Sequence, residues 1–268
     1  MSNVATTYPV ASYPCQVVKF APLSNGSFDT DTFDIELQSP VGTELNYHAG
    51  QYLQLDLDVN GDGQPQTLSY TIASSPDSAN PRRLQLFIQN GSEFADKVLN
   101  CLSQHLENQT PLNVTLAMGK AFLQTDLALP HLLIAAGSGI SKIKSIIEEI
   151  LRRKPDAKVK IYWSNKQIAE FYLLEQFQAW ADQNANLSFT PILELPNANW
   201  NGRTGYIYKV VSEDCAALED TQTYLCGSPN MVYGTIDQLE SNGLKEENCY
   251  SDVFEFAPRG EASCYLKR

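Results

Sequence analysis

The stretch of residues 224–231 constrains the fold of this chain most strongly. Its apolar start, Tyr224-Leu225-Cys226, ends at Gly227-Ser228-Pro229, and a helical pattern begins near Met231. A buried strand that turns directly into a helix is typical of a parallel α/β sheet. Because ligands bind outside the carboxyl ends of such strands, this turn is a candidate binding position.

A second strand-to-helix turn lies upstream. The apolar run at residues 132–136 leads into Gly137-Ser138-Gly139, and apolar residues at helical spacing follow from Ile140. Glycines allow a ligand to approach the backbone, and the free N–H groups of a helix start favour a phosphate. A tight turn without a ligand explains Gly-x-Gly equally well. Lys142 occupies the third glycine position of the dinucleotide fingerprint, which disfavours a conventional Rossmann dehydrogenase.

Residues 14 to about 125 follow a different pattern, in which apolar and polar residues alternate. Alternation predicts half-buried antiparallel strands, and clusters of Pro, Gly, Asn and Asp separate them. Closely spaced strands of this kind predict a barrel or a sandwich, interrupted by one helix near residues 94–102. The strand segments are residues 16–20, 32–37, 52–57 and 84–88.

Residues after about 130 alternate continuous apolar runs with helical segments, which predicts a doubly wound parallel sheet. The boundary between the two patterns falls near residues 126–129. We therefore predict a flexible N-terminus, a strand-rich domain, an α/β domain and a C-terminal tail. Their limits are residues 1–13, 14–126, 127–257 and 258–268.

Composition excludes several classes of function. A net charge of −12 argues against a nucleic-acid partner, which requires clustered Lys and Arg. No apolar stretch is long enough to span a membrane, and the start of the chain lacks a signal-peptide pattern, so we expect a cytoplasmic location. The six cysteines form no Cys-x-x-Cys pair, which indicates free thiols and no zinc site. A calcium-like run at residues 58–63 has Ser69 at its twelfth position, so no metal is predicted.

Several landmarks in a fixed order resemble the ferredoxin–NADP reductase superfamily, and most closely its bacterial NAD(P)H:flavin oxidoreductase branch. The resemblance implies a six-stranded antiparallel flavin-binding barrel followed by a five-stranded parallel nucleotide-binding domain. It covers the chain from about Cys15 to Phe256. The landmarks begin at His48, Leu68, Gly119, Ala136, Tyr162, Trp200, Cys226 and Ser251.

The resemblance also implies roles for individual residues. Tyr70 would lie beside the flavin ring, and the Thr71 hydroxyl would point toward flavin N5. Cys226 and Gly227 would bracket the nicotinamide, so Thr71 and Cys226 are the candidate catalytic residues. Phe254 would lie close to the flavin. The full candidate cofactor site comprises Leu68, Ser69, Tyr70, Thr71, Gly119 and Phe254 for flavin, and Gly137, Ser138, Gly139, Cys226 and Gly227 for nicotinamide nucleotide.

The chain departs from the family pattern at three positions. Leu68 replaces an arginine that usually pairs with a flavin phosphate, a loss of about 1.5–3 kcal/mol for a charge-assisted bond. This favours flavin, FAD or FMN, as a loosely bound substrate, or a different contact to the flavin phosphate. Ser138 replaces a threonine. Lys142 replaces a proline, and it is expected to be solvated or to meet a nucleotide phosphate.

These observations predict an oxidoreductase that transfers hydride from NADH or NADPH to flavin N5 and then releases reduced flavin or passes electrons on. One alternative is an FAD-carrying reductase that feeds a flavin-dependent monooxygenase, another oxygenase or a ferric-chelate acceptor. No ferredoxin-type cysteine cluster is present, so an iron–sulfur partner would be a separate chain. Another alternative is a non-catalytic relative with weakened flavin binding.

Overall fold

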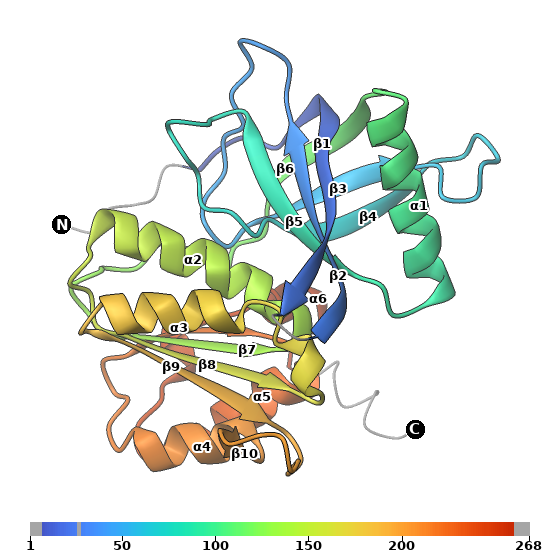
Figure 1. The fold of residues 1–268 in the computed structure, drawn as a ribbon. Helices are drawn as coiled ribbons and strands as arrows, with labels where there is room; N and C mark the ends of the chain where they lie inside the picture. Colours follow the sequence, from blue (N-terminus) through green and yellow to red (C-terminus); the bar gives the residue numbers. More distant parts are fainter. Residues whose placement is uncertain (1–6, 26–27, 260–268) are drawn as a thin grey trace. The chain divides into compact units, whose positions relative to one another are not determined.

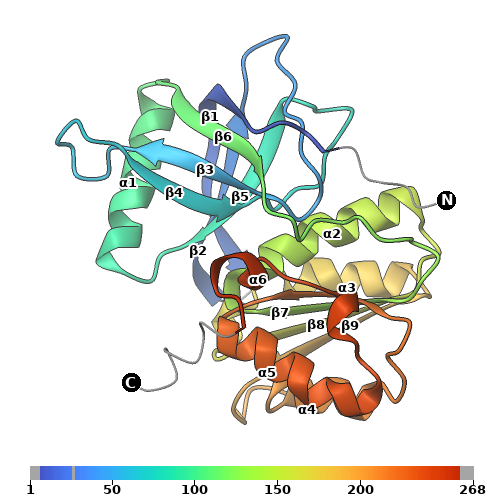
Figure 2. The same cartoon turned by 180° about the vertical axis from the view of Figure 1, so that it is seen from behind.

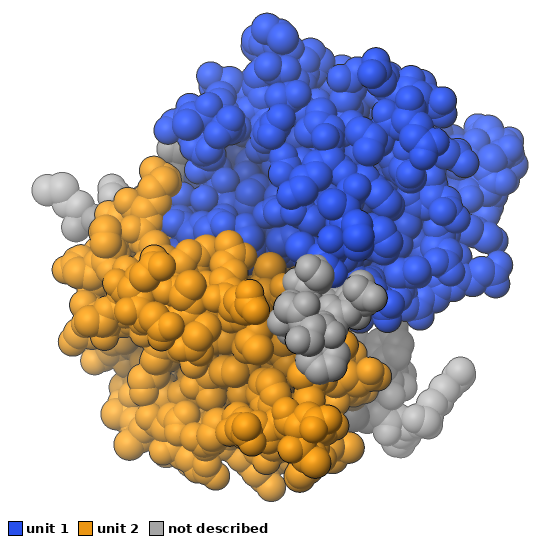
Figure 3. Space-filling view, viewed as in Figure 1, with its two compact units in different colours: residues 1–124, 144–149 blue, residues 125–143, 150–268 orange. Residues whose placement is uncertain are grey.

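The computed structural model describes residues 7–25 and 28–259, in which antiparallel strands are followed by alternating strands and helices (Figure 1; Figure 2, from behind). The chain divides into two compact units (Figure 3). Unit 1 comprises Met1–Gln124 and Lys144–Glu149, and unit 2 comprises Thr125–Ile143 and Ile150–Arg268. Residues 1–6 of the predicted flexible N-terminus and residues 260–268 of the predicted tail lie outside the described residues.

Unit 1 contains a six-stranded antiparallel sheet in the order β4-β3-β6-β1-β2-β5. One helix, α1, follows β5, as the sequence predicts. The first strand begins at Ala11, earlier than the predicted domain start at residue 14, because Ala11 to Cys15 pair with β6. The elements are β1 (Ala11–Asn25), β2 (Phe28–Gln38), β3 (Tyr52–Leu57), β4 (Gln66–Thr71), β5 (Arg83–Gln89), α1 (Glu93–Glu107) and β6 (Leu112–Met118).

The strands of unit 1 share one apolar core. In β3, Leu53, Leu55 and Leu57 are buried while the residues between them are half-buried, as the alternating pattern predicts. Leu68 of the edge strand β4 and Leu84 of the opposite edge strand β5 contact the same core. The sheet therefore curves around its core, which confirms the predicted six-stranded antiparallel first domain.

Unit 2 contains a parallel sheet in the order β10-β9-β8-β7-β11-β12, with α2 and α3 on one face and α4 and α5 on the other (Figure 1). The doubly wound fold is confirmed. The sheet has six strands, not five, because two-residue strands pair at both edges. The strands are β7 (His131–Ala136), β8 (Val159–Asn165), β9 (Leu187–Leu193), β10 (Arg203–Thr204), β11 (Gln222–Cys226) and β12 (Cys249–Tyr250).

Two helices of unit 2, α2 and α5, begin where the sequence places glycine, serine or proline. At the start of α5, the Ser228 hydroxyl accepts a hydrogen bond from the Met231 N–H, and Pro229 occupies the first turn, where its missing N–H costs nothing. The 3₁₀ turn Gly137–Gly139 leads into α2. The helices are α2 (Ile140–Arg153), α3 (Leu174–Gln183), α4 (Ile207–Asp214), α5 (Pro229–Leu239) and α6 (Val253–Phe256).

Within the described ranges, none of the helices combines the length and the apolar character that crossing a bilayer requires.

Candidate functional site

The carboxyl ends of four parallel strands meet at one edge of unit 2. Ala136 at the end of β7 pairs with Ser164 of β8, and Ala135 pairs with Cys226 at the end of β11. The chain runs from β7 outward to β8 and β9 and then returns to β11 on the other side of β7. This reversal of strand order creates the crevice in which doubly wound sheets bind ligands.

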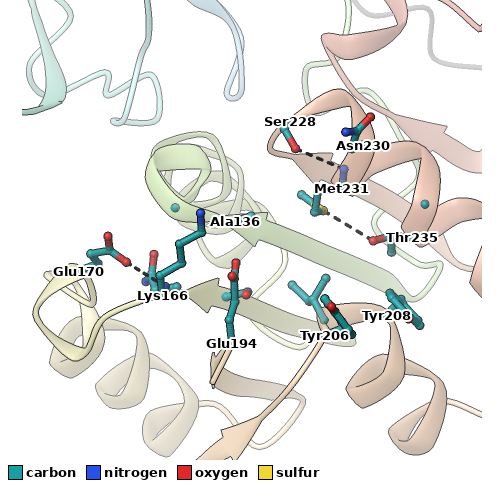
Figure 4. A pocket seen from close by; sticks show the side chains of 15 residues that line it. Ala136, Lys166, Glu170, Glu194, Tyr206, Tyr208, Ser228, Asn230, Met231 and Thr235 are labelled. Atoms are coloured by element: carbon teal, nitrogen blue, oxygen red, sulfur yellow. Dashed lines mark hydrogen bonds between the residues drawn. The ribbon is translucent and has the colours of Figure 1, made fainter. Parts of the chain in front are cut away.

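A cavity of about 620 Å³ lies at this edge (Figure 4), within the usual size range of small-molecule sites. The end of β7, the ends of β8 and β9 and the starts of α4 and α5 contribute to it. Its lining residues are Ala136, Gly137, Ser164, Asn165, Lys166, Glu170, Glu194, Tyr206, Ile207, Tyr208, Ser228, Asn230, Met231, Gly234 and Thr235.

The two glycines of the turn after β7 serve different purposes. Gly137 has φ +57°, a left-handed conformation that favours glycine, and a Cβ there would meet nothing within 4 Å. Gly139 has an ordinary helical φ of −57°, but a Cβ there would lie 2.9 Å from the Cys226 carbonyl carbon and closer still to its oxygen. The Trp163 indole donates a 2.9 Å hydrogen bond to the Gly137 carbonyl and holds the turn.

The end of β11 is equally tight. A Cβ on Gly227 would collide with the Met231 methyl group and would lie 3.3 Å from the Ala136 Cβ. Burial raises the pKa of Cys226 to about 11; Asp252 adds to the shift and Lys142 opposes it. Cys226 is therefore a neutral thiol at physiological pH, suited to packing and not to acid–base work.

Lys142 does not lie where the sequence interpretation expected it. Its side chain is 0% exposed, and its ammonium forms a 2.9 Å ion pair with Asp252 Oδ2. The prediction that Lys142 is solvated is therefore wrong. The pair joins the first turn of α2 to the segment between β12 and α6. The second oxygen, Asp252 Oδ1, is buried and has no hydrogen-bond partner within the described residues.

The structure brings together the candidate residues for the nicotinamide nucleotide, all of which belong to unit 2. Gly137 lines the cavity, and Ser138 continues the same turn. Gly139, Cys226 and Gly227 lie where β7 and β11 approach each other. Sequence analysis did not identify several other residues that line the cavity, including Glu170, Glu194, Tyr206 and Tyr208. The available signal was position alone, because Glu194 directly follows β9 and Tyr206 closely follows β10.

The candidate flavin residues of unit 1 lie together at one end of that unit. Thr71 at the end of β4 pairs with Tyr52 of β3, and Tyr52 also pairs with Met118, the residue before Gly119. Gln51 fixes this arrangement. Its carbonyl accepts a 3.0 Å hydrogen bond from the Ile72 N–H, and its side-chain amide donates to the Gly119 carbonyl at 3.1 Å.

The alternation of β4 sorts its residues between two faces. Leu68 and Tyr70 are half-buried against the core of unit 1, and burial raises the pKa of Tyr70. Ser69 is exposed on the other face, which it shares with Thr71. Leu68 is thus a packing residue of the sheet and offers no positive charge.

The segment after β4 is anchored within unit 1 by polar contacts. The Tyr47 hydroxyl lies 3.1 Å from Ser74 Oγ, and the Ser145 hydroxyl donates to the Ser74 carbonyl at 2.7 Å. The Lys144 ammonium donates to the Ala73 carbonyl at 3.3 Å and pairs with Glu148. These bonds hold the backbone after Thr71 in one conformation.

Phe254 belongs to the short helix α6 of unit 2. Its ring is half-buried at the margin of that unit's core, with its centroid 5.8 Å from that of Tyr233. The flavin contact expected of Phe254 stays a prediction.

Comparisons with known proteins agree with this geometry. Residues 133–236 match the family described as the oxidoreductase NAD-binding domain. The chain is 29% identical over 247 residues to an NAD(P)H-flavin reductase of Vibrio harveyi, covering 90% of this chain and 98% of that protein. It is 26% identical over 238 residues to reductase component 1 of a Comamonas terephthalate 1,2-dioxygenase, covering 88% of this chain and 68% of that protein. Among solved structures, the Amycolatopsis cytochrome P450 reductase GcoB superposes with a TM-score of 0.74 at 22% identity, covering 91% of this chain and 70% of that one.

Proposed function

Because the chain belongs to the ferredoxin–NADP reductase superfamily, we propose that it is an NAD(P)H-dependent flavin reductase. The main observation behind this proposal is the cavity at the carboxyl edge of unit 2. The cavity borders the glycine turn after β7, and there is open space beside Gly137. The similarity to named NAD(P)H-flavin reductases over nearly their whole length supports the assignment. When both cofactors are bound, hydride transfer from nicotinamide C4 to flavin N5 is their own chemistry, and the protein supplies binding and orientation.

The residues of unit 2 suit a nicotinamide nucleotide. The open space at Gly137 leaves room for a phosphate at the backbone, and the N-terminus of α2 favours negative charge there. Cys226 and Gly227, at the end of the neighbouring strand, would flank the nicotinamide. Since the Cys226 thiol stays protonated, its part is to pack against the ring and orient it.

The residues at the end of β4 suit a flavin. Thr71 would present its hydroxyl to the ring, Tyr70 would lie beside it, and Gly119 and Ser69 would complete the site. Leu68 packs in the sheet and provides no phosphate partner, which supports a flavin that exchanges with solvent. Phe254 would contribute a further aromatic contact.

This function predicts flavin-dependent oxidation of nicotinamide nucleotide. Purified protein should be nearly colourless, and added FMN, FAD or riboflavin should accelerate NADH or NADPH oxidation, followed by the loss of absorbance of the reduced nucleotide. Leu68→Arg should tighten FMN and FAD binding but leave riboflavin, which has no phosphate, nearly unchanged. Absence of oxidation with every flavin and both nucleotides would overturn the proposal.

A second prediction concerns Thr71. Thr71→Val keeps the branched shape and removes the hydroxyl, so single-turnover flavin reduction should slow about three- to tenfold, the equivalent of one neutral hydrogen bond. Thr71→Ser retains the hydroxyl and should reduce flavin at nearly the wild-type rate. If the valine variant is as fast as wild type, Thr71 only packs in the sheet.

A second candidate function is electron supply to a protein partner. The relative of 26% identity named as a reductase component of a dioxygenase favours it. Tightly retained FAD, together with low activity toward free flavins, would distinguish this alternative. In either case, the five described cysteines are free thiols, which supports action in the reducing cytoplasm.

A further inference from the structure

One half of the cavity in unit 2 is acidic. Among the described residues that line it, the charged side chains are Lys166, Glu170 and Glu194. All three follow β8 or β9, on the side of β7 away from Cys226. Two carboxylates and one ammonium leave this half of the cavity with a net negative charge.

The Glu170 carboxylate binds the backbone of its own loop. Its Oε2 atom accepts 2.9 Å hydrogen bonds from the backbone N–H groups of Lys166 and Gln167. Glu170 therefore shapes the loop after β8 through Oε2, and its charge contributes to the field in the cavity.

Glu194 is available for a ligand. Its backbone N–H donates a 2.9 Å hydrogen bond to the Asn165 carbonyl, which fixes it against the end of β8. Its half-buried carboxylate makes no hydrogen bond or ion pair with any residue that the structure describes. Figure 4 shows this carboxylate directed into the cavity between Lys166 and Tyr206.

The arrangement of the strands indicates which half of a nucleotide meets Glu194. In a doubly wound sheet the pyrophosphate lies at the turn after the first strand, and the adenosine ribose lies toward the strands that follow it directly. Here those strands are β8 and β9, while Cys226 lies on the opposite side of β7. The stacked rings of Tyr206 and Tyr208, 5.7 Å apart, offer an aromatic surface on the same side.

Resting on the proposed function, we propose that Glu194 makes the pocket select NADH over NADPH. Its carboxylate would accept hydrogen bonds from the free hydroxyls of the adenosine ribose. A 2′-phosphate in the same place would meet a carboxylate with no compensating cation, and like charges brought together disfavour binding.

Lys166 is the residue that could argue for the opposite preference. Figure 4 shows its ammonium turned toward Ala136, at the end of β7 where the glycine turn begins. There it would meet the pyrophosphate, which NADH and NADPH share, and would not distinguish the two nucleotides.

Calorimetric binding of ADP-ribose and 2′-phospho-ADP-ribose tests this selectivity without any flavin or turnover. Wild-type protein should bind ADP-ribose at least about tenfold more tightly, the factor that one charge-assisted hydrogen bond provides. Glu194→Gln should reduce the preference about tenfold, and Glu194→Arg should reverse it. Glu175→Gln, which removes the same charge from an exposed position on α3 outside the lining, should leave the preference unchanged.

Lys166→Gln completes the test, because it should weaken both ligands by a similar factor. The proposal is overturned if wild type binds the 2′-phosphorylated ligand equally well or binds neither ligand. An unchanged preference in Glu194→Gln, or a loss in Lys166→Gln confined to the 2′-phosphorylated ligand, also overturns it. Selective binding of ADP-ribose without flavin-dependent NADH oxidation would support the selectivity and refute the reductase function, so the two failures are distinguishable.

Discussion

Lys142→Met should lower the free energy of unfolding of unit 2 by about 3–5 kcal/mol, the usual cost of breaking a buried ion pair by removing one partner. The reason is that Asp252 would keep a charge whose partner is gone, while its Oδ1 already lacks a hydrogen-bond partner within the described residues. All three tryptophans, Trp163, Trp180 and Trp200, lie in unit 2. Denaturant unfolding followed by tryptophan fluorescence therefore reports this unit directly.

Two further variants test the cause of that loss. Lys142→Met combined with Asp252→Leu removes both charges and should recover most of the lost stability, since apolar replacement of a buried pair is often neutral. Lys154→Met breaks the surface Lys154–Asp156 pair of unit 2 and should cost at most about 1 kcal/mol. If Lys142→Met unfolds at the wild-type denaturant concentration, the pair does not stabilise unit 2.

Gly137→Ala and Gly139→Ala should each weaken ADP-ribose binding at least about tenfold, but for different reasons. At Gly139 the added methyl would overlap the Cys226 carbonyl group, so β7 and β11 must separate at the edge where the nucleotide binds. Overpacking of this kind costs about 1–3 kcal/mol, and we expect at least about a tenfold loss of affinity. At Gly137 the methyl would enter the open space proposed for the phosphate, and the left-handed backbone adds a cost of about 1–2 kcal/mol.

Calorimetry with ADP-ribose measures the affinities, and tryptophan fluorescence confirms that both variants are folded. Gly91→Ala in unit 1, where an added Cβ meets nothing within 4 Å and φ is not positive, should change neither quantity. Wild-type affinity in Gly137→Ala would contradict the phosphate position, and wild-type affinity in Gly139→Ala would show that the close approach to Cys226 is unimportant for binding.

The sequence alone was sufficient for those features that depend on local pattern. The alternation in residues 52–57 identified β3, since one face of an antiparallel strand is buried and the other is not. The continuous apolar run at residues 132–136 identified β7, because a central parallel strand is covered on both faces. The turn Gly137-Ser138-Gly139 was recognisable because glycine is needed wherever backbone conformation or space excludes a side chain.

Only the tertiary structure decided how distant residues meet. Lys142 and Asp252 are far apart in the chain, and no local pattern distinguishes a buried lysine with a distant carboxylate from a solvated one. Glu194 follows β9 in a segment without a motif, and it faces the cavity only because parallel strands align their carboxyl ends at one edge. Local periodicity reflects which face of an element is buried, whereas a binding site depends on strand order, and strand order is set by packing between segments remote in sequence.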